Sequence, residues 1–111
     1  MKLIPTLQDG SYKFITTKES SVPKDAVAMI RESEGTTLII PAAEGEDEVF
    51  AWISLVNETL LTETGITATF SEALADAGIA CNVLAGFHHD HILVPYDKRN
   101  QAAEIIAALE V

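Results

Sequence analysis

The segment VFAWISLV, residues 49–56, constrains the fold more than any other part of the sequence. Every residue in it except Ser54 is apolar. Successive side chains of a β-strand point to opposite faces, so a strand of this composition is apolar on both faces. Such a strand needs a protein layer on each face. The sequence therefore predicts a central strand that is covered on both sides.

The rest of the second half predicts a helix, two strands and a final helix. The helices are expected over residues 66–78 and 97–110, and the strands over 79–89 and 91–95. The buried stripes of the two helices are expected to be Ile66, Phe70, Leu74 and Ala77, and Ala102, Ile105, Ile106 and Leu109. This is the order of a ferredoxin-like βαββαβ unit without its last strand. The segment LIPTL, residues 3–7, is expected to supply that strand.

The first half predicts a strand over residues 11–17, a short helix over 20–34 and a strand over 36–42. The helix rests on the spacing of Ala26, Met29 and Ile30, with Pro23 in its first turn and Gly35 at its exit. The acidic segment EGEDE, residues 44–48, reads as a solvated connector. We therefore expect two units, residues 1–45 and residues 49–111.

Composition limits the function classes. The chain has 111 residues and a formal net charge of −10, which argues against a nucleic-acid partner. No apolar run approaches the roughly 20 residues that would span a bilayer, and the start MKLIPTLQDG lacks the apolar stretch of a signal peptide. The lone cysteine, Cys81, fits a reducing compartment. These features predict a cytoplasmic protein with no membrane contact.

Two stretches carry a family resemblance. The segment LVNETLLTETGITATFSEALADAGIACNVLAG resembles the first β-α-β of an ACT domain. The segment AGFHHDHILVPYDKRNQAAEII resembles the continuation in small bacterial proteins with two ACT-like units, which are related to the ACT modules of aspartate kinases and of an animal cytosolic arginine sensor. The resemblance implies an α+β fold of two ferredoxin-like ACT subdomains with antiparallel sheets, the first abbreviated. It also implies a regulatory or sensing module without catalysis or cofactor, a homodimer that binds a small molecule, usually an amino acid.

The resemblance also implies where the ligand binds. The positions that match the ACT ligand site are Glu63, Thr64, Gly65, Ile66 and Thr67 at the helix start, and Cys81, Asn82 and Val83 on the second strand. The sequence departs from the common ACT loop, Asp-x-Pro-Gly, because it has no proline there. A helix start with a glycine suits a carboxylate, since its N–H groups are unpaired and the backbone can be approached closely. The alternative is that Thr64 caps the helix and Gly65 only makes a turn.

The segment HHDH, residues 88–91, holds all three histidines. If His89 and Asp90 form a two-residue turn, His88 and His91 lie opposite each other with β-carbons roughly 5 Å apart. With Asp90 they could then hold a zinc or nickel ion, which would make the protein metal-responsive. The structural alternative is a polar hairpin tip, with Gly86 at a bulge or a close approach. A purely structural oligomerisation module is the other alternative for the whole chain.

A catalytic interpretation is disfavoured. Cys81 with a histidine is the only nucleophilic pair that the sequence offers. At about 3.3 Å per residue of strand, Cys81 and His88 would lie on the order of 20 Å apart. The sequence therefore predicts a protein that is not an enzyme.

Overall fold

The computed structural model describes all residues from Met1 to Val111. Its elements are β1 (Pro5–Leu7), β2 (Tyr12–Thr17), β3 (Ala28–Glu32), β4 (Gly35–Pro41), β5 (Phe50–Leu55), α1 (Ile66–Asp76), β6 (Asn82–Ala85), β7 (Asp90–Pro95), the short 3-10 helix η1 (Tyr96–Lys98) and α2 (Arg99–Ala107). The α+β fold with antiparallel sheets is confirmed. Neither helix is long and apolar enough to cross a membrane.

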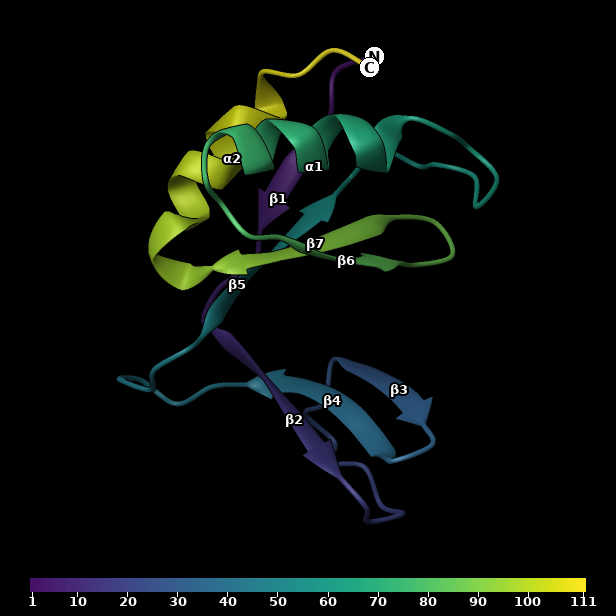
Figure 1. The fold of residues 1–111 in the computed structure, drawn as a ribbon, viewed down its shortest axis with the longest axis vertical. Helices are drawn as coiled ribbons and strands as arrows, with labels where there is room; N and C mark the ends of the chain where they lie inside the picture. Colours follow the sequence, from purple (N-terminus) through teal and green to yellow (C-terminus); the bar gives the residue numbers. More distant parts are fainter.

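The second half, together with β1 from the amino terminus, forms a helix-backed sheet, which we define as strands β1, β5, β6 and β7 with α1 and α2 on one face (Figure 1). All neighbouring strands are antiparallel, in the order β6-β7-β5-β1. Strand β1 pairs with β5 from Pro5–Leu55 to Leu7–Ile53. The expectation that residues 3–7 supply the fourth strand of this sheet is therefore confirmed.

Strand β5 is buried on both faces, as its composition predicts. Its residues Ala51, Ile53 and Leu55 face the helices and are fully buried. The helices contribute Ile66, Phe70, Leu74, Ala102 and Ile106 to the same core. Of the predicted stripes, Ala77 is instead exposed at the helix end, and Ile105 and Leu109 are half-buried.

The first half forms a small sheet, which we define as strands β2, β3 and β4 in the order β3-β4-β2. The predicted helix over residues 20–34 is wrong. Residues 28–32 instead form strand β3, which pairs with β4 from Ala28–Ile39 to Glu32–Gly35 and turns through Ser33 and Glu34. Three apolar residues at helical spacing are a weak signal, and pairing with a neighbouring strand outweighs it.

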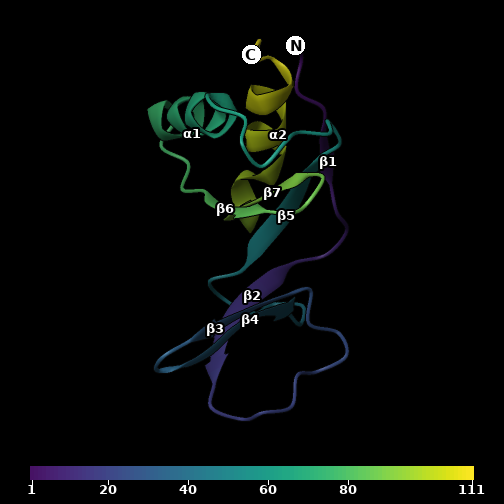
Figure 2. The same cartoon turned by 90° about the vertical axis from the view of Figure 1, so that its right-hand side faces the viewer.

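The small sheet packs on the face of the helix-backed sheet that is away from the helices. A second cluster of Ile39, Trp52 and Leu93 joins the two sheets. The backbone connection is slight, because β2 and β5 share only the pair Tyr12–Phe50. The small sheet therefore lies at the end of the molecule opposite the helices (Figures 1 and 2).

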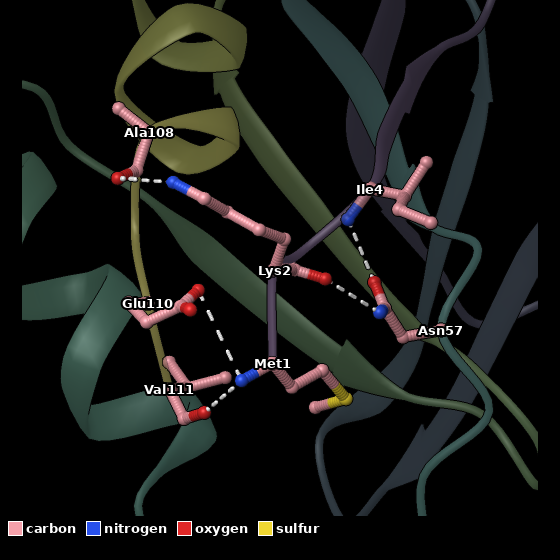
Figure 3. Close-up of polar contacts among 7 residues, drawn as sticks. All are labelled: Met1, Lys2, Ile4, Asn57, Ala108, Glu110 and Val111. Atoms are coloured by element: carbon pink, nitrogen blue, oxygen red, sulfur yellow. Dashed lines mark hydrogen bonds and ion pairs between the residues drawn. The ribbon is translucent and has the colours of Figure 1, made fainter.

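The two chain ends meet beside β1 (Figure 3). The backbone N–H of Val111 donates to the carbonyl oxygen of Met1 at 2.9 Å, and Lys2 forms an isolated bridge with Glu110. Asn57 holds the start of β1 from the other side. Its Oδ1 accepts from the backbone N–H of Ile4 at 2.7 Å, and its Nδ2 donates to the carbonyl of Lys2 at 2.9 Å.

These contacts predict that Asn57→Ala destabilises the fold. The change removes two hydrogen bonds that hold the amino-terminal strand, so we expect a loss of about 1 kcal/mol in the free energy of unfolding. Urea unfolding measures it. Asn100→Ala is the matched control, because Asn100 is exposed on α2 and makes no side-chain hydrogen bond. Equal stability of the two variants would contradict the role given to Asn57.

Candidate functional site

A pocket of about 140 Å³ opens at the start of α1. Three segments line it: the loop between β5 and α1, the first turn of α1, and the hairpin between β6 and β7. The lining residues are Thr59, Leu60, Leu61, Glu63, Gly65, Ile66, Thr67, Ala85, Gly86 and Asp90. Ligand pockets for drug-sized molecules are commonly about 300–1,000 Å³. This pocket therefore suits a smaller molecule.

The helix start has no side-chain cap. The N-cap residue is Gly65, with a φ of 91°, and no side-chain hydrogen bond caps the helix. This φ lies in the left-handed region that favours glycine. Thr64 is therefore not the N-cap residue, contrary to the alternative interpretation of this segment. The first turn also has no acidic residue, so the positive end of the helix dipole is not neutralised by its own side chains.

The hairpin of β6 and β7 holds the pocket wall, and we call it the histidine hairpin because it contains His88, His89 and His91. The backbone N–H of Thr59 donates to the carbonyl of His88 at 3.1 Å. His88 Nδ1 lies 3.1 Å from Glu58 Oε1, and His89 Nδ1 lies 3.2 Å from the carbonyl oxygen of Asn57. The loop also closes on itself, because Glu63 Oε1 accepts from the N–H of Leu60 at 2.8 Å. Two of the three histidines thus fix the loop that lines the pocket.

The structure brings only part of the expected site together. Glu63, Gly65, Ile66 and Thr67 line the pocket, and Thr64 is exposed beside it. The three residues expected on the second strand do not line it. Cys81 and Val83 pack toward the helix-side core, and Asn82 lies in a hollow on the opposite face with Phe14, Phe50 and Pro95. Alternation along the chain sends neighbouring side chains to opposite faces.

The expected turn at His89 and Asp90 is also wrong. Asp90 pairs with Ala85 and His91 with Leu84, so the tip of the hairpin is Phe87 and His88. His88 and His91 are therefore not opposite each other. No three His, Cys, Asp or Glu side chains lie close enough together to hold a metal ion. The shift of the turn instead places Asp90 in the pocket, a role that the sequence did not indicate.

Gly86 lies where two backbone segments of the hairpin approach each other closely, as one of the two interpretations of this glycine expects. A β-carbon at this position would lie 2.7 Å from the carbonyl oxygen of His89 and 3.2 Å from Nε2 of His91. The first of these contacts is with backbone and is too short for any side chain. The glycine is therefore needed where the hairpin turns beside the pocket.

His91 lies on the other face of β7, beside Trp52 and Ser54. Its Nδ1 is 2.9 Å from Ser54 Oγ and 3.3 Å from Trp52 Nε1. The indole N–H of Trp52 also lies 3.1 Å from Ser54 Oγ, so Trp52, Ser54 and His91 form one hydrogen-bonded cluster. Partial burial lowers the pKa of His91, the nearby His89 lowers it further, and Asp90 opposes both.

Cys81 has no catalytic partner. It is a free thiol that lies at the end of β6 opposite the histidine hairpin. Burial raises the pKa of Cys81. The thiolate, which is the nucleophilic form, is thereby disfavoured.

Two family models match the chain, and both describe an ACT domain. One matches residues 46–108 and the other residues 1–57. This chain belongs to the ACT domain family. ACT domains are small-molecule-binding regulatory modules. The sequence resemblance is thus confirmed, and the helix start that lines the pocket falls within the first of the two matches.

Solved structures agree over nearly the whole chain. A protein of unknown function from Vibrio cholerae, described as a possible transport protein, has a TM-score of 0.83 at 33% identity, over 97% of this chain and 89% of that one. A protein from Agrobacterium tumefaciens has a TM-score of 0.73 at 20% identity, over 96% and 88%. The second likeness shows the fold alone. No curated protein matches the chain.

The His91 contacts predict a pH dependence of stability. The folded protein holds the pKa of His91 below its ordinary value of 6.5, so folding favours the neutral ring. This stabilisation is present above about pH 6.5 and is lost as the pH falls through the folded pKa. The free energy of unfolding should therefore fall less between pH 7.5 and 5 in His91→Gln than in the wild type, as measured by urea unfolding. Identical pH profiles would contradict the prediction.

Proposed function

We propose that this ACT protein is a non-catalytic regulatory module that binds a free amino acid in the pocket at the start of α1. One observation carries the proposal: the uncapped helix start and the carboxylate of Asp90 line the same small pocket. A free amino acid carries one negative and one positive group. The pocket offers complementary chemistry for both.

The α-carboxylate is assigned to the helix start. The first N–H groups of a helix have no partner within the helix and carry a partial positive charge. Gly65 and Ile66 line the pocket at that point, and Thr67 adds a hydroxyl. The positive φ of Gly65 sets the backbone here, and a β-carbon on it would have nothing within 4 Å. The backbone is thus open to a ligand.

The α-ammonium is assigned to Asp90. The pocket lining contains two carboxylates, Glu63 and Asp90, and no basic side chain. Glu63 already accepts a hydrogen bond from the N–H of Leu60. Asp90 makes no side-chain hydrogen bond or ion pair within the chain and is half-buried, so it is the free acceptor. A ligand with a second negative charge would be disfavoured by these two carboxylates.

The remaining parts of the proposal concern the oligomeric state, the cellular location and the partners of the protein. We propose a homodimer in the cytoplasm, with neither a nucleic acid nor a membrane as partner. The net charge of −10 supports the exclusion of nucleic acid. Cys81, Asn82 and Val83 do not line the pocket. The proposed site therefore consists of the helix start, the loop before it and the histidine hairpin.

A thermal-shift screen with the twenty amino acids and several divalent metals tests the proposal. A ligand at a hundredfold excess over its dissociation constant stabilises the folded state by about 2.7 kcal/mol. We expect a shift with at least one amino acid. A shift with metals alone, abolished by a chelator, would replace the proposal with a metal-responsive protein. No shift with any compound would favour a purely structural module.

The helix start is tested by Gly65→Ala. The substitution forces a β-carbon into a left-handed backbone, which costs about 1–2 kcal/mol and disturbs the loop that meets the ligand. We expect the dissociation constant of the amino acid to rise at least about tenfold, which isothermal titration calorimetry measures. Gly45→Ala is the matched control. Gly45 has a φ of 84°, also has nothing within 4 Å of its β-carbon position, and lies outside the pocket.

The ammonium contact is tested by Asp90→Asn. The change removes a charge-assisted hydrogen bond worth about 1.5–3 kcal/mol, so affinity should fall about tenfold or more. Asp97→Asn is the control, since Asp97 is exposed and lies outside the pocket. Unchanged calorimetric affinity in Asp90→Asn would remove Asp90 from the site. The amino-acid ligand is identified first with the wild-type protein. The affinity of a variant therefore tests the role of the substituted residue and not whether the protein binds an amino acid.

A further inference from the structure

We propose that the edge strand β3 of the small sheet is the dimer interface, and that it pairs antiparallel with β3 of a second copy. The proposal rests on the homodimer proposed above and adds the surface that forms it. Strand β3 lies at the outer edge of the small sheet, at the end of the molecule away from the helices (Figure 1). The pocket at the start of α1 takes no part in it.

The first argument is that β3 is the edge strand that exposes large apolar side chains. Unpaired strand edges invite pairing with other chains, and proteins protect them with prolines, charges or short strands. Strand β1 has three residues and begins with Pro5, and β6 has four residues with no exposed large apolar side chain. Strand β3 has five residues: its last two, Arg31 and Glu32, are charged, but its Met29 and Ile30 are 45% and 44% exposed.

The second argument is the placement of charge. Residues 11–42 carry four basic side chains, Lys13, Lys18, Lys24 and Arg31, and four acidic ones, Glu19, Asp25, Glu32 and Glu34. This half therefore has no net charge, and the rest of the chain carries the whole −10. Two copies repel each other through their acidic parts. Contact between the small sheets keeps those parts farthest apart, so two copies repel each other least when they meet at this end.

The third argument is geometric. An antiparallel pair of identical strands is related by a two-fold axis, which closes the assembly at two copies. A register centred on Ile30 sets this side chain beside the partner's Ile30 and sets Met29 opposite the partner's Arg31. Two three-stranded sheets thereby become one continuous six-stranded sheet. A contact of this length lies at the low end of interface sizes, below about 1,200 Å², so the dimer is expected to be weak and concentration-dependent.

The test is multi-angle light scattering of the full chain from low micromolar to near-millimolar concentration. We expect the wild type to pass from monomer to dimer. Ile30→Glu should raise the dimer dissociation constant at least about tenfold, because two carboxylates then face each other across the axis. Leu60→Glu is the matched control: Leu60 is 71% exposed on the other large apolar surface, beside Leu61 and Phe87. Circular dichroism checks that both variants fold.

A second readout fixes the register. In a Cys81→Ser background, Ile30→Cys should form an intermolecular disulfide under mild oxidation, whereas Val22→Cys should not. If Leu60→Glu abolishes the dimer and Ile30→Glu does not, the interface is the apolar surface of Leu60, Leu61 and Phe87. The β3 proposal is then wrong. If the wild type stays monomeric throughout, the homodimer itself is wrong. Neither result bears on amino-acid binding, which the thermal-shift screen measures separately.

Discussion

Burial of β5 on both faces is the constraint on which the rest of the structure depends. Ala51, Ile53 and Leu55 require the helices on one side, and Trp52 requires the small sheet on the other. The same strand pairs with β1, β7 and, through one residue pair, β2. Each layer of the molecule is therefore placed by contact with this strand. Without a cover for Trp52, a large apolar surface would face solvent.

Strong local patterns made the second half predictable, and weak ones made the first half less so. The helices over 66–78 and 97–110 and the role of residues 3–7 follow from long periodic segments and from element order. The helix over 20–34 fails because Met29 and Ile30 suit a strand as well as a helix, and the neighbouring β4 decides between them. The division of the chain into two units at residues 44–48 stays a prediction.

The expected site residues line the pocket where their position depends on the backbone and not where it depends on register. The glycine at the helix start, which the sequence analysis singled out, lines the pocket. A turn displaced by two residues moves every side chain after it to another partner. That displacement separates His88 from His91 and places Asp90 in the pocket. Asn82 lies away from the pocket for a related reason, since one residue along a strand changes the face.

The histidine hairpin connects the pocket to the small sheet by direct contact. Asp90 faces the pocket, and the next residue, His91, faces Trp52 on the opposite side of the same strand. Trp52 in turn packs against Ile39 of β4, which pairs with β3. A shift of the backbone at Asp90 would therefore change the position of the His91 ring against Trp52. Closely packed interiors transmit strain to neighbouring side chains. In the proposed function, this chain of contacts is the route by which occupancy of the pocket would alter the small sheet, a surface that another molecule can meet.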